Sequence, residues 1–342
     1  MEKMQSDGIK IRIPKQVIIE TSASCQLRCE GCPINGAHEG GFMKLTNFLS
    51  IIDRIDFDTT IIPWMNGEPL LHKDYAAILQ ILTERNLRAY VTTNGMIWND
   101  AVMQIMAAKN SIYQIIFSLD GHPMGWSNSQ MLCRPGSREK TIVDNIRRFG
   151  KLKEGMGNNI DIAVKICRRG QDQAEVEKYI VYWLKEHYID YVCEGKMLWN
   201  DQAPEVRTHP CRYPDDMFMV IRSDGQMVPC AYNHEVVNEN YFKWPNVFDD
   251  REKPMLEYYN DPKLQDFRKK QELGIYPGPC ATCGFAYTGE GFEGGIQFRD
   301  PMLRSQFPNP IYWHSDYYNQ FYSLTRKWKP AVPTNGMPLE AE

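Results

Sequence analysis

Three cysteines, Cys25, Cys29 and Cys32, stand in a C-x3-C-x2-C arrangement directly after an apolar run at residues 16–22. Thiolates at this spacing can ligate three irons of a [4Fe–4S] cluster and leave the fourth iron open to a ligand. The competing interpretation, a zinc site, needs a fourth Cys or His close by, and residues 25–33 hold none. The spacing therefore indicates a redox-active iron–sulfur site.

The bulk composition narrows the class of protein. The chain has 342 residues, ten cysteines and a formal net charge of -4. This mild acidity argues against nucleic acid or an anionic membrane as a partner bound by bulk charge. Residues 1–16 lack the apolar core of a secretory signal, and no stretch reaches the roughly 18–20 apolar residues of a membrane span. We therefore expect a cytoplasmic protein whose clustered cysteines bind metal instead of forming disulfides.

Short β-branched runs alternate with longer amphipathic segments from residue 16 to about residue 200, after an N-terminal segment at 1–15. Strands are expected at 16–22, 59–65, 88–94, 113–120, 161–167 and 190–195, and helices near 44–55, 74–86, 98–109, 136–153 and 173–187. Such βα units predict an α/β fold, here a partial (β/α)6 barrel of TIM type. Beyond it we expect a small loop-rich domain at 201–290 and an aromatic C-terminal extension at 291–342.

Side chains alternate along a barrel strand, so each strand has an inward and an outward set. In 161–167, Ile162, Val164 and Ile166 form an apolar outward face, which leaves Lys165 and Cys167 inward. Extended to the other strands, the rule predicts a polar inward set of Glu20, Trp64, Asn66, Glu68, Thr92, Asn94, Ser118, Asp120 and Glu194, and an outward Cys193. Barrel enzymes place their chemistry at these strand ends. The alternative is that the polar groups solvate the barrel rim.

The segment CQLRCEGCP at 25–33 resembles the cluster motif of the radical S-adenosylmethionine (SAM) superfamily. The resemblance implies that the open iron chelates SAM, which is cleaved to a 5′-deoxyadenosyl radical that abstracts a hydrogen atom from the substrate. Gly31 stands where the family often has an aromatic residue.

Three strand-end segments extend this resemblance. NGEP at 66–69 resembles the family's Gly-Gly-Glu-Pro segment, with Asn66 in place of the first glycine, and TNG at 93–95 and SLDG at 118–121 match signatures common in the family. The SAM contacts so implied are Asn66, Gly67, Glu68, Asn94, Ser118 and a basic residue for the carboxylate, Lys165 or Arg168.

A second cysteine set follows at C-x13-G-x4-C and, later, C-x2-C. It resembles the twitch domain, a short form of the SPASM domain, and so implies one auxiliary [4Fe–4S] cluster and two clusters in all. The implied ligands are Cys211, Cys230, Cys280 and Cys283. FMVIRSDGQMVPC, which spans 218–230, predicts a hairpin that turns at Asp224-Gly225. A zinc site with four thiolates is the alternative.

The layout is similar to that of 2-deoxy-scyllo-inosamine dehydrogenase-like enzymes. This similarity implies a radical SAM oxidoreductase that oxidises a small alcohol or amine, such as an aminocyclitol or sugar, with Asp120, Glu194 or Asp215 as candidate base. Modification of a peptide or protein is the second hypothesis, and redox-neutral epimerisation with Cys167 as hydrogen donor is the third. The expected partners are a small-molecule substrate and a reductant such as flavodoxin or ferredoxin.

Overall fold

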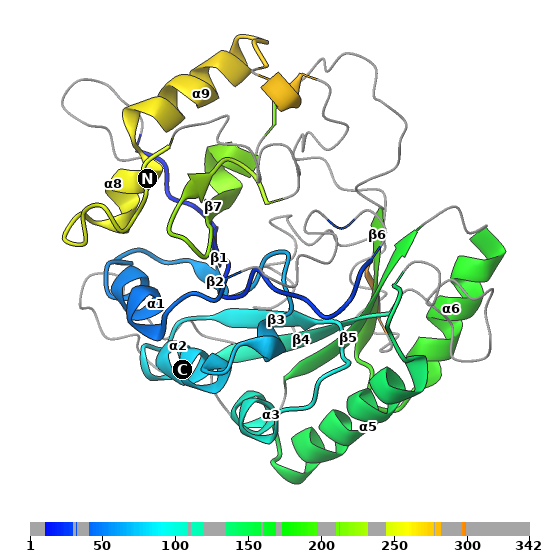
Figure 1. Ribbon diagram of the computed structural model, residues 1–342. Coiled ribbons are helices and arrows are strands. Elements are labelled where there is room, and N and C mark those ends of the chain that lie inside the picture. The colour runs from blue at the N-terminus through cyan, green and yellow to red at the C-terminus, as the bar shows by residue number, and fades with distance from the viewer. Residues whose placement is uncertain are drawn as a thin grey trace, which may run out of the picture.

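A mixed sheet with helices on one face organises the computed structural model. The structure describes residues 11–29, 32, 41–108, 111–119, 134–158, 160–168, 173–196, 210–211, 213–231, 244–276, 278–281 and 296–298. Six parallel strands form the centre: β1 (Gln16–Ile19), β2 (Thr60–Ile62), β3 (Ala89–Thr93), β4 (Ile112–Ser118), β5 (Asp161–Arg168) and β6 (Tyr191–Lys196). The helices on their outer face are α1 (Leu45–Ile52), α2 (Tyr75–Glu84), α3 (Asp100–Ala107), α5 (Glu139–Gly155) and α6 (Gln173–Lys185) (Figure 1). The alternation of strand and helix confirms the predicted partial barrel.

The sheet continues beyond the six barrel strands at both edges. β7 (Phe218–Ile221) runs parallel to β1, and β8 (Met227–Val228) is antiparallel to β7. At the other edge, β9 (Ile296–Phe298) pairs antiparallel with β6. The strand order is β8-β7-β1-β2-β3-β4-β5-β6-β9. The first barrel strand, β1, therefore does not pair with the last, β6, and the barrel is open. The predicted hairpin is confirmed, and Gly225 in its turn has φ +84°, a conformation that favours glycine.

The two faces of the sheet carry separate apolar clusters. The cluster on the helix side includes Ile162, Val164 and Ile166, and the inner cluster includes Ala163, so the alternation predicted for β5 is confirmed. The prediction for Cys193 was wrong, because this residue belongs to the inner cluster and is paired with Lys165 in the β5–β6 register. An error of one residue in the assumed alternation reverses every position on a strand. The same correction applies to Glu194, predicted inward, whose register partner Ile166 belongs to the helix-side cluster.

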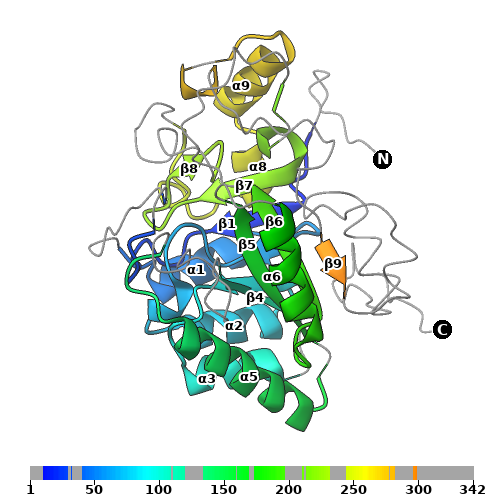
Figure 2. The same ribbon diagram turned by 90° about the vertical axis from the view of Figure 1, so that its right-hand side faces the viewer.

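The C-terminal region lies against the β1 end of the sheet (Figure 2). Its described helices are the short π-helix η2 (Tyr213–Met217), α8 (Met255–Tyr259), α9 (Pro262–Glu272) and the 3-10 turn η3 (Gly278–Cys280). Arg54, just after α1, reaches this region through its guanidinium group, which donates hydrogen bonds to the carbonyls of Val247 and Asp250. In the described part of the chain, no helix is both long and apolar enough to cross a membrane.

Candidate iron–sulfur and cofactor site

The loop after β1 carries the cysteine triad. Cys25, Cys29 and Cys32 are all partly buried, and the Cys32 N–H donates to the Cys29 carbonyl at 3.1 Å. Burial, together with the nearby negative charges of Glu68 and the other two cysteines, raises the pKa of the Cys25 thiol to about 12, although the hydrogen bond from the Leu27 N–H opposes the shift. Thiolates that repel one another in this way need a cationic partner, which the irons of a cluster supply. Within the described residues, no group of three His, Cys, Asp or Glu side chains lies close enough together to hold a metal ion.

Gly67 joins the NGEP segment to the cysteine loop. A Cβ at this position would lie 2.1 Å from the Ser22 carbonyl oxygen and 2.8 Å from that of Ser24. The neighbouring Glu68 N–H donates to the same Ser24 carbonyl at 2.8 Å. Only glycine allows the two backbones to approach this closely, so Gly67 holds the end of β2 against the residues that precede Cys25.

The Glu68 carboxylate binds its own chain. One oxygen accepts from the Thr93 hydroxyl at 2.8 Å and the Leu70 N–H at 3.1 Å, and the other accepts from the Asn94 N–H at 2.8 Å. The side chain is only 2% exposed, and burial raises its pKa to about 7 although these donors oppose the shift. Glu68 therefore ties the end of β2 to the end of β3, and its implied contact with SAM stays a prediction.

The segment after β2 carries two buried hydrogen-bond donors. Among the described residues, the buried indole N–H of Trp64 and the buried amide nitrogen of Asn66 meet no hydrogen-bond partner. Trp64 packs against the inner cluster with its ring edge-on to Tyr90. In the β4–β5 register Ser118 lies beside Lys165. Because a buried donor without an acceptor costs about 1–3 kcal/mol, this arrangement fits a ligand that supplies oxygen acceptors, such as the SAM carboxylate.

The sequence-predicted bases have different outcomes. Asp120 lies outside the described residues. Of Cys167, Arg168 and Glu194 the structure describes only the backbone, in β5 and β6, so their roles stay predictions. Asp215, in η2, forms an ion pair with Arg12, so its carboxylate is already engaged with a guanidinium group.

Glu20 is a carboxylate that our assignment of bases missed. It follows β1 with the inward parity of Ile18 and is 3% exposed. Burial raises its pKa to about 6, partly offset by the hydrogen bond from the Ser223 N–H at 3.1 Å and by the charge of Arg222. The strand alternation had already placed Glu20 inward, but the sequence gives no sign of the burial that perturbs it.

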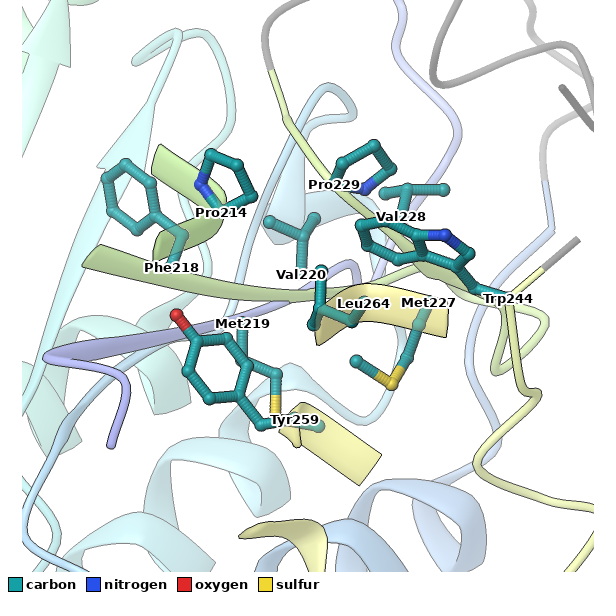
Figure 3. A pocket seen from close by; sticks show the side chains of 10 residues that line it. All are labelled: Pro214, Phe218, Met219, Val220, Met227, Val228, Pro229, Trp244, Tyr259 and Leu264. Atoms are coloured by element: carbon teal, nitrogen blue, oxygen red, sulfur yellow. The ribbon is translucent and has the colours of Figure 1, made fainter. Parts of the chain in front are cut away.

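The described members of the second set, Cys211, Cys230 and Cys280, are partly buried, and Cys283 lies outside the described residues. Near Cys211, whose N–H donates to the Gln271 side chain at 3.5 Å, an apolar crevice separates η2 and the β7–β8 hairpin from α8 and α9 (Figure 3). Its lining is Pro214, Phe218, Met219, Val220, Met227, Val228, Pro229, Trp244, Tyr259 and Leu264.

Comparisons with known proteins agree with this geometry. Residues 211–284 match the model of SPASM, an iron–sulfur cluster-binding domain. A tungsten-containing aldehyde ferredoxin oxidoreductase cofactor-modifying protein of Pyrococcus furiosus is 22% identical, over 79% of this chain and 87% of that protein.

Solved structures share the fold. The structure of BtrN with AdoMet and 2-DOIA is 17% identical, with a TM-score of 0.50 over 80% of this chain and 93% of BtrN. SuiB of Streptococcus suis bound to S-adenosylmethionine is 16% identical, with a TM-score of 0.57 over 76% of this chain and 68% of SuiB. anSMEcpe with bound AdoMet is 15% identical, with a TM-score of 0.55 over 75% of this chain and 83% of its own.

The C-x3-C-x2-C triad follows the first strand of a partial barrel, and the chain shares this fold with proteins crystallised with AdoMet. The match over 211–284 adds a second region that binds an iron–sulfur cluster. Residues 211–284 of the chain thus carry a SPASM-type iron–sulfur domain.

Proposed function

We propose that this enzyme oxidises a small alcohol or amine, such as an aminocyclitol or sugar, in natural-product biosynthesis and uses two [4Fe–4S] clusters. The observation that carries the proposal is the SPASM match, which spans Cys211, Cys230, Cys280 and Cys283. An electron acceptor beside a radical-generating site favours net oxidation. The likeness to BtrN, crystallised with 2-DOIA, covers nearly all of that protein and supports the same substrate class.

The residues divide the work as follows. When bound, SAM and the first cluster supply a 5′-deoxyadenosyl radical for hydrogen-atom abstraction, and the second cluster supplies an acceptor for one electron. Cys25, Cys29 and Cys32 hold the first cluster. The unpartnered donor of Asn66, together with Ser118 and Lys165, binds SAM.

The substrate's O–H or N–H proton needs a base near the inner face of the barrel. We propose Glu20, because a carboxylate with a pKa of about 6 is largely ionised at pH 7 and still takes up a proton readily. Its backbone N–H donates to the Ile221 carbonyl, and its side chain accepts from the Ser223 N–H, so the carboxylate is held between β1 and the β7–β8 hairpin. Asp120 stays as an alternative base. Glu194 pairs with Ile166 of the helix-side cluster in the β5–β6 register, so the corrected parity of β6 does not favour it.

Anaerobic reconstitution tests the proposal. We expect about eight irons and eight sulfides per chain, as two cubane clusters require, and one deoxyadenosine for each oxidised product when an aminocyclitol such as 2-deoxy-scyllo-inosamine is supplied with a flavodoxin or ferredoxin system. A chain that binds only about four irons, or zinc instead of iron, would contradict the two-cluster assignment.

Modification of a peptide or protein is the second candidate. It is favoured by the shared fold of SuiB bound to its precursor peptide SuiA. Deoxyadenosine formed only with a peptide or protein, and never with aminocyclitols or sugars, would favour this candidate.

Redox-neutral epimerisation is the third candidate. Besides Cys167, the buried Cys193 lies on the inner side of the sheet, beside Lys165, and so offers a second thiol as hydrogen donor. Deuterium from solvent in an otherwise unchanged product, lost in Cys167→Ala or Cys193→Ala, would support epimerisation over oxidation.

A further inference from the structure

The side chain of Asn94, at the end of β3, lies against the cluster loop. Its amide nitrogen approaches Cys25 Sγ at 3.8 Å, and its amide oxygen accepts from the Gln26 side chain at 3.1 Å. The Cys25 sulfur also accepts from the Leu27 N–H at 3.4 Å. Asn94 itself is only 7% exposed, so little water competes for these contacts.

The orientation of the Asn94 amide is fixed by a backbone donor. The Met96 N–H donates to the Asn94 side-chain oxygen at 3.0 Å, and a backbone N–H cannot accept in return. The oxygen must therefore face Met96, which leaves the NH2 group directed at Cys25. The backbone of Asn94 is held as well, because its own N–H donates to the Glu68 carboxylate at 2.8 Å.

We propose that Asn94 is a positioning residue of the SAM-binding cluster, which donates an N–H···S hydrogen bond to the ligand Cys25 and thereby raises the cluster's reduction potential. The resemblance implied a contact between Asn94 and SAM, whereas the geometry directs this amide at the cysteine. The inference rests on a cluster at Cys25, Cys29 and Cys32.

The physical reason is electrostatic. Reduction adds negative charge, which is shared by the cluster and its thiolate sulfurs, and a donor aimed at one of these sulfurs stabilises the reduced state more than the oxidised state. Low exposure strengthens the effect, because water screens the dipole less. The bond also connects the cluster to Glu68, so the NGEP segment and the cysteine loop keep a fixed geometry.

The test is a redox titration of the reconstituted holoenzyme, followed by electron paramagnetic resonance. The signal of the SAM-binding cluster is recognised by its change when SAM is added. In Asn94→Ala the donor is lost without a change of charge, and in Asn94→Asp an isosteric carboxylate replaces it. We expect the midpoint potential to become more negative in both variants, further in Asn94→Asp. Asn99→Asp is the matched control, because Asn99 caps α3 through Val102, where aspartate serves equally well.

Iron content separates the possible failures. A wild-type chain without iron at the triad refutes the cluster assignment itself. With the cluster present, an unchanged potential in Asn94→Ala refutes the hydrogen bond, even if Asn94→Asp shifts through its charge. If Asn94→Ala does not retain iron, Asn94→Ser is measured in its place, because serine keeps an acceptor for the Met96 N–H. The proposal then requires the same negative shift of the midpoint potential in Asn94→Ser. An equal shift in Asn99→Asp also overturns the proposal, because the effect would then be one of general charge.

Discussion

Two buried carboxyl groups near the cofactor site, Glu20 and Glu68, have pKa values of about 6 and about 7, both raised by burial. In the unfolded chain a glutamate titrates near 4.5. Between these values the native state binds more protons than the unfolded state, so the free energy of unfolding falls as pH rises. Both groups thus stabilise the fold fully below about pH 4.5, and this contribution is lost as pH rises through their folded pKa values.

Glu20→Gln tests this linkage. Glutamine can still accept from the Ser223 N–H but does not titrate, so the loss of unfolding free energy between pH 4.5 and pH 7 should shrink by about 2 kcal/mol, the equivalent of the shift. Urea unfolding over this pH range measures it. Glu252→Gln, at an exposed position, is the control and should leave the pH dependence unchanged. If the unfolding free energies of Glu20→Gln and the wild type changed with pH in the same way, the raised pKa of Glu20 would be contradicted.

At the scale of elements, β4 and β5 followed the sequence and β6 did not. Ile115 and Phe117 of β4 lie in the cluster on the helix side, as predicted, because strict alternation over several residues fixes the parity. β6 offers one short apolar run, and its two faces differ little in hydrophobicity, so Cys193 was placed on the wrong face. Beyond Ile62 the alternation lapses, since Trp64 and Met65 both contact the inner cluster.

Gly67→Ala tests the junction between the end of β2 and the cysteine loop. The added methyl group would overlap the Ser22 carbonyl, so we expect a loss of about 1–3 kcal/mol in unfolding free energy, typical of overpacking, and a lower iron content on reconstitution. Gly41→Ala is the matched control, because a Cβ there meets nothing within 4 Å. Equal iron content in the two variants would show that the junction tolerates the methyl group.

At the scale of the whole molecule, local patterns located the barrel and the cysteine sets, but not how the two regions meet. The pairing of β7 with β1 and of β9 with β6 joins segments far apart in the chain, and no periodicity encodes such a register. The surroundings of Asp215 were likewise not predictable from local patterns. Its pairing with Arg12 of the N-terminal segment could not be anticipated, because no spacing rule links residues so distant in sequence.

Arg54 is the clearest case of such a long-range contact. Its guanidinium group donates to the Val247 carbonyl at 3.0 Å, to that of Asp250 at 2.9 Å and to that of Lys253 at 3.2 Å. Arg54→Ala should therefore lower the unfolding free energy by about 2–3 kcal/mol, because charged hydrogen bonds are lost and carbonyls left unpaired. Hydrogen exchange should accelerate in 244–255 while β3 to β5 stay protected.

Arg251→Ala is the control for this prediction, because Arg251 donates to the Asn47 side chain at an exposed position and an exposed contact contributes little. Arg54→Lys keeps the charge but offers no planar fork of donors, so its loss should lie between those of Arg54→Ala and the wild type. If exchange in 244–255 were unchanged in Arg54→Ala, the backbone bond from the Met255 N–H to the Arg54 carbonyl and the apolar contacts of α8 would suffice to hold the C-terminal region on α1.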